Sequence, residues 1–428
     1  MPEPFPKRLA IVNRQMDQLT ALLRTVIPAN PFYSLKFDTA DAPRKIGHLG
    51  QFAERIPFTT KQELVADQLA TPPYGTNLSC PLDRFVRCHQ TSGTAGVPLR
   101  WLDTAESWEW MLNNWVEILQ SAGVSGADRV FCAFSFGPFI GFWLAFEAAQ
   151  RMGCLVLPGG GLSSAARLQS ILDQGATVLC CTPTYALRLA EVAAQERLDL
   201  NTGAVRLIIV AGEPGGSIPA TRQQIEQAWP GARVYDHHGM TEVGPVSFEC
   251  PAHPGRLHIL ESSYIAEIVH PETGRALEPG QVGELILTPL GRTGMPLLRY
   301  RTGDLVKSAL DSFCQCGRSD LALEQGIIGR TDDMVVVRGV NVYPSAVEEI
   351  VRSSGEVAEY RVHVSSAQGL VEMSLEIEPK PECEDVSGLV RNLERGFDHA
   401  LALRVPVRVV ASDSLPRFEL KSKRWHRS

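Results

Sequence analysis

The sequence lacks a strong excess of charge of either sign. Its 428 residues include 41 Lys and Arg against 48 Asp and Glu, which gives a formal net charge of −7. This balance offers no general attraction to phosphate backbones, and no Lys/Arg cluster outside the C-terminal tail indicates a nucleic-acid face. We therefore expect no nucleic-acid partner.

The sequence also lacks a secretion signal and a membrane span. Pro2, Pro4 and Pro6 open the chain and no apolar run follows a basic flank, so we expect the mature protein to begin near Met1. The most apolar stretch, Phe131 to Phe146, is shorter than the roughly 20 residues of a spanning helix and contains Ser, Gly and Pro. We expect a buried strand and a pocket-lining loop there, and no membrane partner.

The ten cysteines lack the spacing of a disulfide framework. Cys180 and Cys181 are adjacent inside an apolar run, where neighbouring side chains point in opposite directions. A reducing, cytoplasmic compartment is the expected location.

The order of apolar segments predicts two unequal domains. Short apolar strands alternate with helices between Arg129 and Val234, the pattern of parallel α/β layers, and strands and turns follow Tyr235. We expect a large α/β domain over residues 1–331, with parallel sheet layers plus a distorted β-barrel-like part, and a small mobile α+β domain over residues 332–428. The expected helices are Arg8–Ile27, closed by Pro28 and Pro31, with Thr184–Gln195, Ala220–Ala228 and Ser387–Leu403; the expected strands are Thr177–Cys181, Arg206–Val210, Tyr264–Val269, Gly283–Thr288, Asp304–Ser308, Tyr360–Val364, Val371–Ile377 and Val407–Val410.

A Ser/Thr/Gly segment, Thr91 to Pro98, has the composition of a phosphate-binding loop. Glycines let backbone N–H groups approach an anion, and the hydroxyls can donate to phosphate oxygens. No Gly-Lys-Ser/Thr follows, so the segment is not the nucleoside-triphosphatase loop. Taken alone, it fits a plain surface loop equally well.

Further motifs lie on both sides of this segment in a fixed order. One motif, Ile56–Lys61, precedes it. The motifs after it are His238–Glu242, Tyr300–Asp304, Gly329–Asp333, Arg338–Pro344, and Leu415-Pro416-Arg417 with Lys421. In this order the chain resembles the adenylate-forming enzyme superfamily, and its phenylacetate-CoA ligase branch in particular, over nearly its whole length. The resemblance implies a ligase that joins ATP and a carboxylic acid into an acyl-adenylate.

The resemblance also implies roles for single residues. The phosphate loop would be Ser92, Gly93, Thr94 and Gly96; the nucleotide would also contact Gly212, Glu213, Asp236, His237, His238, Gly239 and Met240. Thr241 would contact the α-phosphate and Glu242 would hold Mg²⁺, which prefers carboxylate and phosphate oxygens. Asp304 would accept both ribose hydroxyls.

The C-terminal motifs would supply the moving parts. Arg330 would lie against the ribose and phosphate, and Asp332 would be the hinge of the small domain. Lys421 would offset the charge that gathers on the attacked phosphate, with Lys423 as the alternative. Gly339 would leave room for the pantetheine arm of coenzyme A.

Two positions depart from the family pattern. His238 stands where the family usually has Tyr, whose ring stacks on adenine, and His is smaller and titratable. Leu420 stands where the family often has Gly before the lysine. These departures put the nucleotide affinity and the lysine turn in question, and they keep an inactive nucleotide-binding relative as a rival hypothesis.

A second set of residues has the chemistry of a structural zinc site. Cys250, His258, Cys314 and Cys316 could supply four N and S ligands, which would leave no open position for catalysis. His253 could replace His258, and unliganded core thiols are the alternative interpretation.

The acid pocket is expected at an aromatic stretch that includes Phe134, Phe136, Phe139 and Ile140, since such walls suit an aryl or arylacetic acid. The expected reactants are thus that acid, ATP, Mg²⁺ and coenzyme A. An amine or a carrier-protein thiol stays open as the acyl acceptor, and a homodimer is expected only by analogy with the relatives.

Overall fold

The computed structural model describes residues 7–91, 98–311, 313–338, 340–367, 370–419 and 422–427. Contacts divide the chain into two compact units, each described below by itself. The first unit comprises residues 1–160 and 236–327, and the second comprises residues 161–235 and 328–428. No helix in the described ranges is long and apolar enough to cross a membrane.

The first unit joins N-terminal helices to parallel and antiparallel strand pairs. β3 pairs with β4 in parallel, whereas β12, β13 and β14 form antiparallel pairs. Its elements are α1 (Arg8–Ala29), α2 (Pro31–Thr39), α3 (Leu49–Arg55), α4 (Lys61–Ala70), β1 (Phe85–Gln90), β2 (Arg100–Thr104), α5 (Ala105–Ser121), β3 (Arg129–Cys132), α6 (Trp143–Arg151), β4 (Leu155–Pro158), β8 (Gly239–Met240), β9 (Gly244–Pro245), β10 (Ser247–Glu249), β11 (Leu257–Ile259), β12 (Tyr264–Val269), β13 (Val282–Pro289), β14 (Tyr300–Lys307) and β15 (Ala322–Leu323).

The first helix differs from the prediction at its end. Pro28 lies inside α1, and Pro31 is the first residue of α2, where a missing N–H costs nothing. The helix therefore continues two residues beyond the predicted end at Ile27.

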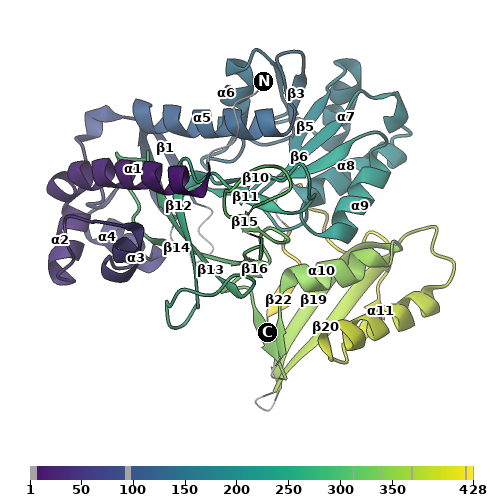
Figure 1. Ribbon diagram of the computed structural model, residues 1–428. Helices are drawn as coiled ribbons and strands as arrows, with labels where there is room; N and C mark the ends of the chain where they lie inside the picture. The colour runs from purple at the N-terminus through teal and green to yellow at the C-terminus, as the bar shows by residue number, and fades with distance from the viewer. Residues whose placement is uncertain are drawn as a thin grey trace. The chain divides into compact units, whose positions relative to one another are not determined.

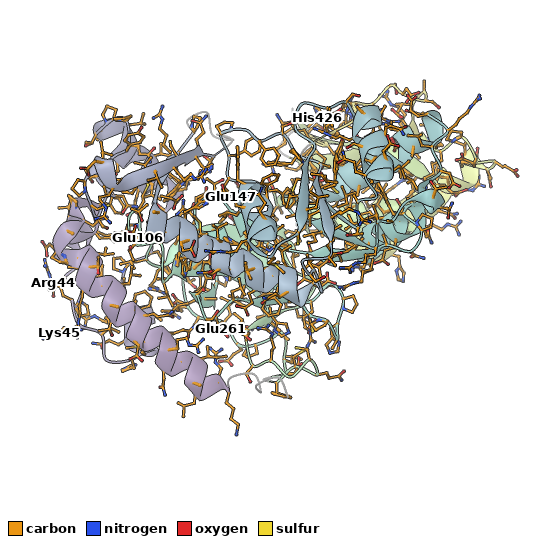
Figure 2. The ribbon with its side chains drawn as sticks, turned by 90° about the horizontal axis from the view of Figure 1, so that it is seen from above. Arg44, Lys45, Glu106, Glu147, Glu261 and His426 are labelled. Carbon is orange, nitrogen blue, oxygen red and sulfur yellow. The ribbon has the colours of Figure 1, made fainter. Side chains whose placement is uncertain are left out.

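A carboxylate fastens three elements of the first unit together. Glu147 on α6, labelled in Figure 2, accepts a hydrogen bond from the indole Nε1 of Trp108 on α5 at 2.7 Å. The guanidinium of Arg87 on β1 lies 2.8 Å from the other oxygen of Glu147. These bonds hold α5, α6 and β1 in one arrangement.

The second unit contains two parts. Residues 161–235, called here the helical segment, carry helices α7, α8 and α9 together with strands β5, β6 and β7. Residues 328–428 are called here the C-terminal lobe. In the helical segment β5 pairs with β6 in parallel. The elements of this unit are α7 (Ser164–Asp173), β5 (Val178–Cys181), α8 (Pro183–Gln195), β6 (Leu207–Val210), α9 (Pro219–Ala228), β7 (Arg233–Asp236), β16 (Gly329–Arg330), β17 (Val335–Val337), β18 (Val340–Val342), α10 (Pro344–Ser353), β19 (Val357–Ala367), β20 (Leu370–Pro379), α11 (Val386–Leu401), β21 (Val407–Val409) and β22 (Trp425–Arg427).

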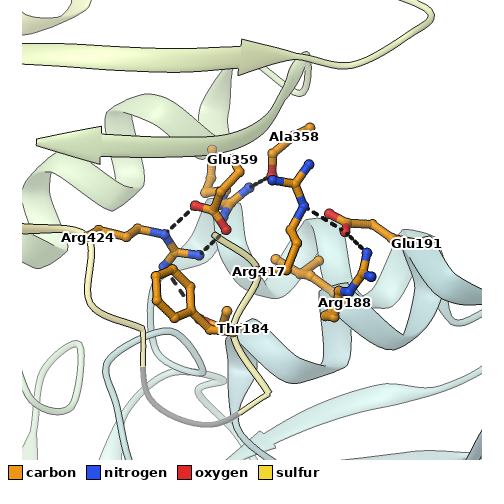
Figure 3. A pocket seen from close by; sticks show the side chains of 10 residues that line it. Thr184, Arg188, Glu191, Ala358, Glu359, Arg417 and Arg424 are labelled. Carbon is orange, nitrogen blue, oxygen red and sulfur yellow. Dashed lines mark hydrogen bonds and ion pairs between the residues drawn. The ribbon is translucent and has the colours of Figure 1, made fainter. Parts of the chain in front are cut away.

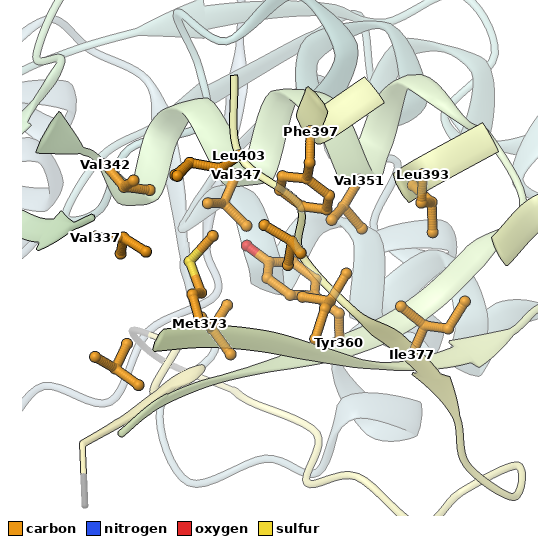
Figure 4. Close-up of a cluster of buried hydrophobic side chains, with 14 of the residues drawn as sticks. Val337, Val342, Val347, Val351, Tyr360, Met373, Ile377, Leu393, Phe397 and Leu403 are labelled. Carbon is orange, nitrogen blue, oxygen red and sulfur yellow. The ribbon is translucent and has the colours of Figure 1, made fainter. Parts of the chain in front are cut away.

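The C-terminal lobe is an α+β unit with its own core. Its sheet has the strand order β21-β20-β19-β22, and α10 and α11 lie on one face of it (Figure 1). Val347 and Val351 from α10 and Phe397 from α11 pack against Tyr360 and its neighbours on the strands (Figure 4). Every buried residue of this core lies between positions 335 and 405, so the core is built from the lobe alone.

Candidate active site and metal centre

Two of the sequence motifs, Ile56–Lys61 and Tyr300–Asp304, lie against each other in the first unit. The backbone N–H of Thr59 donates to the carbonyl of Arg299 at 3.0 Å, and that of Arg301 donates to the carbonyl of Thr59 at 2.9 Å. The side chain of Thr60 then caps α4 in a capping box with Glu63, so that α4 begins at Lys61. The first motif is therefore fixed to β14.

Hydrogen bonds from β10 hold the segment that runs from Asp236 to Glu242. The N–H of Asp236 donates to Glu249 at 2.8 Å, and the N–H of His238 donates to the hydroxyl of Ser247 at 3.0 Å. Burial lowers the pKa of His237 to about 3, so its ring is neutral and Nδ1 donates to the Ser247 carbonyl at 2.7 Å. The segment is thus fixed to β10.

His238 and Asp304, expected at the adenine and at the ribose, contact each other directly. The Nε2 atom of His238 lies 2.9 Å from Oδ2 of Asp304, and both side chains are largely buried. The buried Nδ1 atom of His238 has no hydrogen-bond partner among the described residues. With Nε2 as the donor, Nδ1 is an acceptor, which a bound nucleotide could use.

The Thr241–Glu242 segment is held by a buried ion pair that the sequence did not reveal. Arg292 is 1% exposed, and its Nη1 donates to the carbonyls of Thr241 at 2.7 Å and Glu242 at 2.8 Å. The same guanidinium binds the buried carboxylate of Asp103 through two bonds of 2.7 Å. The carboxylate of Glu242 is nearly buried and lies 3.6 Å from the ammonium of Lys61.

Of these supporting residues, only Lys61 had a signal in the sequence, because it ends the Ile56–Lys61 motif. Asp103 and Arg292 lie 189 positions apart, and no local pattern connects them. Their pairing could be found only in the tertiary structure.

An aromatic cluster connects the Asp236–Glu242 segment to the expected acid pocket. The ring of His237 lies 4.4 Å from that of Trp115, which lies 6.2 Å from Phe142, and Phe142 lies 5.3 Å from Phe134. Trp115 and Phe142 were not among the expected site residues. The four expected residues lie in the loop after β3; Phe134 and Ile140 are buried, whereas Phe136 and Phe139 are partly exposed.

The phosphate-loop residues Ser92, Gly93, Thr94 and Gly96 lie outside the described residues. The strands on either side, β1 and β2, pair antiparallel with Gln90 opposite Arg100. The N–H of Thr91 donates to the carbonyl of Leu99 at 2.9 Å, and the N–H of Leu99 donates to the hydroxyl of Thr91 at 3.1 Å.

In the second unit, Gly212 and Glu213 follow β6. Gly212 has φ 97°, a left-handed backbone that favours glycine, and the Glu213 carboxylate accepts a bond from the N–H of Ser422 at 2.8 Å. Near the start of the C-terminal lobe, Nε of Arg330 binds Asp332 at 2.9 Å. Gly339, Leu420 and Lys421 lie outside the described residues, and Lys423 is exposed.

The four residues of the expected zinc site converge in the first unit. The ligand atoms of Cys250, His258, Cys314 and Cys316 all lie within 4.8 Å of one another, and His253 is not a member of this set. Cys250 Sγ lies 3.4 Å from Cys314 Sγ, and Cys316 Sγ lies 3.4 Å from His258 Nε2. Ligand atoms around a tetrahedral zinc ion are separated by about 3.5 to 3.8 Å, so these distances fit.

Neighbouring groups favour cation binding at His258 and Cys314, whereas burial raises the pKa of the Cys250 and Cys316 thiols. His258 Nδ1 lies 3.2 Å from the carbonyl of Asp320, which fixes the proton there and leaves the Nε2 lone pair facing Cys316. Burial lowers the pKa of His258 to about 4. Burial opposes ionisation of the Cys314 thiol, but hydrogen bonds from the Cys316 N–H and from neighbouring groups outweigh it and lower the pKa of that thiol.

Comparison with known proteins supplies the family. A model described as AMP-binding enzyme matches residues 61–290, and a model described as AMP-binding enzyme C-terminal domain matches residues 339–426. The chain belongs to the AMP-binding enzyme family. The first match alone covers more than half of the chain, and the second falls inside the C-terminal lobe.

Curated relatives of this AMP-binding enzyme place it in the phenylacetate-CoA ligase branch. It is 30% identical to the phenylacetate-coenzyme A ligase of Pseudomonas putida over 426 residues, which is 96% of this chain and 93% of the relative. The ligase of Escherichia coli K12 is 31% identical, with 96% and 93% covered. The resemblance expected from the motifs is confirmed.

Solved structures confirm the fold class of this family member. The structure of 2-hydroxyisobutyryl-CoA ligase in the postadenylation state, with R3-HIB-AMP, has a TM-score of 0.94 at 27% identity and covers 99% of this chain and 91% of that one. The same ligase in the thioesterification state, with 2-HIB-AMP and CoA, has a TM-score of 0.71 at 28% identity, with 99% and 91% covered. That ligase therefore differs in shape between its postadenylation and thioesterification states.

Proposed function

We propose that this protein is an AMP-forming acid–thiol ligase that converts an aryl or arylacetic acid to its coenzyme A thioester. The acid's carboxylate attacks the α-phosphorus of ATP, pyrophosphate leaves, and an acyl-adenylate forms. The thiol of coenzyme A then attacks the acyl carbon, and AMP leaves. Membership of the phenylacetate-CoA ligase branch over nearly the whole chain is the observation that carries this proposal.

The ordered Asp236–Glu242 segment supports the nucleotide roles. In this proposal His238 faces the adenine, Asp304 accepts the ribose hydroxyls, and Thr241 contacts the α-phosphate. Glu242 would hold Mg²⁺ between its carboxylate and the phosphate oxygens, as hard cations prefer. Lys61, 3.6 Å from Glu242, would add a positive charge where pyrophosphate leaves.

The remaining roles stay as the sequence implied them. Ser92, Gly93, Thr94 and Gly96 would hold the outer phosphates, and Gly212 and Glu213 would border the adenine. Arg330 would contact the ribose and phosphate, Asp332 would be the hinge of a small domain over residues 332–428, Gly339 would admit the pantetheine arm, and Lys421 would assist adenylation.

The aromatic cluster supports an aryl rather than a small aliphatic acid. Phe134 makes edge-to-face contacts with Phe136 at 6.4 Å and Phe139 at 5.2 Å, so ring edges and faces converge in this loop. A substrate ring would join such a cluster by the same contacts, each worth about 0.5 to 1.5 kcal/mol beyond area burial.

We also propose that Cys250, His258, Cys314 and Cys316 hold a structural Zn²⁺. The four ligand atoms, the fixed His258 tautomer and the near-tetrahedral separations support it. Four protein ligands close the coordination sphere, so the ion would stabilise the fold around β11 and take no part in the reaction.

The decisive experiment measures pyrophosphate release with ATP and Mg²⁺ against aryl, arylacetic and aliphatic acids, each with and without coenzyme A. We expect release that depends on an aryl or arylacetic acid, rises with coenzyme A, and yields a thioester. If release is unaffected by coenzyme A, the acyl acceptor is an amine or a carrier-protein thiol instead of coenzyme A. Release only with small aliphatic acids would overturn the aryl specificity.

A further inference from the structure

The C-terminal segment from Leu415 to Arg427 is fastened at both ends to its own lobe. The guanidinium of Arg417 binds Glu378 at 2.7 Å, and that of Arg424 binds Glu359 through bonds of 2.6 and 3.1 Å. Beyond Arg424, β22 pairs in parallel with β19. These contacts lie within the lobe, so they persist wherever the lobe moves.

The middle of the same segment makes a second set of contacts, with the helical segment 161–235. One oxygen of the Glu213 carboxylate accepts bonds from the N–H of Ser422 at 2.8 Å and from its hydroxyl at 3.1 Å. The other oxygen accepts a bond from the N–H of Thr184 at 3.0 Å, in the first turn of α8. Glu213 therefore ties Ser422 to the start of α8.

A matching contact lies on the other side of positions 420 and 421. The carboxylate of Glu419 accepts a bond from the hydroxyl of Ser164 at 3.2 Å and lies 3.8 Å from the guanidinium of Arg167. Arg167 is 3% exposed, so its charge is only weakly screened by water. The chain is thus held to the helical segment immediately before and immediately after Leu420 and Lys421.

The contacts that Glu419 and Ser422 make with the helical segment are called here the docking contacts, and all of them are polar. Arg417 adds a contact of 3.5 Å with Glu191 on α8, at a cavity of about 10 Å³ that could hold one water molecule (Figure 3). Polar contacts beside water are exchanged for water at low cost, whereas the packed core of the lobe is not.

We propose that Glu213 is a positioning residue for adenylation: its bonds to Ser422 dock the C-terminal segment for the first step and are broken for the second. The proposal rests on the proposed function, because it assumes that Lys421, next to Ser422 in the chain, assists adenylation. The difference in shape between the postadenylation and thioesterification states of 2-hydroxyisobutyryl-CoA ligase supports a contact that exists in only one of them.

The variant Glu213→Gln tests this role with little change in shape. The carboxylate serves Thr184 and Ser422 with different oxygens, whereas the amide has a single acceptor oxygen and can serve only one of them. We expect the acid-dependent release of pyrophosphate to fall about tenfold in kcat, with the KM for ATP unchanged because only the backbone of Glu213 would border the adenine. Thioester formation from supplied acyl-adenylate and coenzyme A should proceed at the wild-type rate.

Two further variants separate docking from other effects. Ser422→Ala removes the hydroxyl that donates to Glu213, so its effect on adenylation should not add to the effect of Glu213→Gln. Glu419→Gln changes a separate contact, so its effect should add to that of Glu213→Gln. The control is Gln169→Ala on α7, which removes only an exposed bond to Asp173 and should leave both steps unchanged.

Amide hydrogen exchange of a peptide covering residues 415–427 gives a readout that does not depend on activity. In Glu213→Gln, exchange there should become faster, and in Gln169→Ala it should not. Unchanged exchange, an equal loss in both chemical steps, or a raised KM for ATP alone would overturn the docking role and leave Glu213 as an adenine contact. Faster exchange in a protein that activates no acid would uphold the docking contact and refute the proposed function.

Discussion

At the scale of single residues, the contact between His238 and Asp304 is the main departure from the family pattern. The ring that would face adenine instead bonds the carboxylate that would accept the ribose hydroxyls, at 2.9 Å. A nucleotide would have to share Asp304 with His238. We therefore expect a lower affinity for ATP than a ring without this bond would give.

The variant His238→Tyr tests this competition. A tyrosine at this position presents a larger stacking surface, and base–aromatic stacking is worth about 1 to 3 kcal/mol. We expect the KM for ATP to fall several-fold in His238→Tyr and to rise in His238→Ala, as steady-state kinetics of pyrophosphate release would show. A lower KM in His238→Ala would mean that the ring only obstructs the nucleotide.

Arg292 is the second residue-scale case, because it holds the carbonyls of both Thr241 and Glu242. In Arg292→Gln the buried Asp103 carboxylate loses its partner, which should cost about 3 to 5 kcal/mol in the free energy of unfolding. The double variant with Asp103→Leu and Arg292→Met should recover much of that stability, because both charges are gone. It should not recover the rate of adenylation.

Chemical denaturation measures the stability, and pyrophosphate release measures the adenylation rate, of the Arg292→Gln variant and of the double variant. If the double variant regained both stability and rate, Arg292 would be a structural residue only, and the Thr241–Glu242 segment would be held well enough by β10.

At the scale of elements, the turn at Cys314–Cys316 faces Cys250 and β11 and should depend on metal. We expect one zinc ion per chain, lost in Cys314→Ser together with several degrees in Tm, because a closed site contributes folding energy. Adenylation at 25 °C should be retained by the fraction that is folded. The exposed Cys88 supplies the control: Cys88→Ser should keep the metal, as measured by atomic emission. A wild-type protein free of metal would leave the four side chains as core thiols.

Helix α10 and strand β19 are joined by a buried charge network. Burial disfavours the ionised Glu348, but the guanidiniums of Arg424 and Arg352 outweigh it and lower the pKa of this carboxyl from 4.5 to about 2. A lowered folded-state pKa stabilises the protein above the unfolded value, and that stability is lost as the pH falls from about 4.5 towards 2.

The variant Glu348→Gln should remove the stability that the ionised Glu348 carboxylate contributes. It should lower the free energy of unfolding at pH 7 by about 3 kcal/mol and flatten the acid dependence between pH 5 and about 2. Unfolding curves recorded at several pH values for both proteins measure the difference. Parallel acid dependence in the two proteins would show that the network contributes nothing to folding.

At the scale of the whole molecule, the C-terminal lobe should fold alone, because all the buried residues of its core lie between positions 335 and 405. We expect a fragment of residues 328–428 to unfold cooperatively, followed by the fluorescence of Trp425, its only tryptophan. The remaining residues 1–327 should release no pyrophosphate, because they lack Lys421. A fragment with no cooperative transition would show that the lobe needs the helical segment 161–235.

The sequence by itself determined the family, the order of the motifs and most elements. Periodicity predicted Tyr264–Val269 at its observed bounds, and the expected helix at Thr184–Gln195 differs from α8 by one residue. The signals that predict these elements are local, because the apolar pattern and the capping residues lie within short stretches of consecutive residues. Pro28 misled the prediction for α1, because it lies in the last turn of the helix and does not end it.

Only the tertiary structure decided which distant groups meet. It paired Asp103 with Arg292 and His238 with Asp304, and it placed His258 rather than His253 among the candidate zinc ligands. It also showed that Glu213 binds Ser422, 209 positions away. A motif fixes the chemistry of a side chain, but the partner of that side chain depends on the packing of elements far apart in the chain, which no local pattern records.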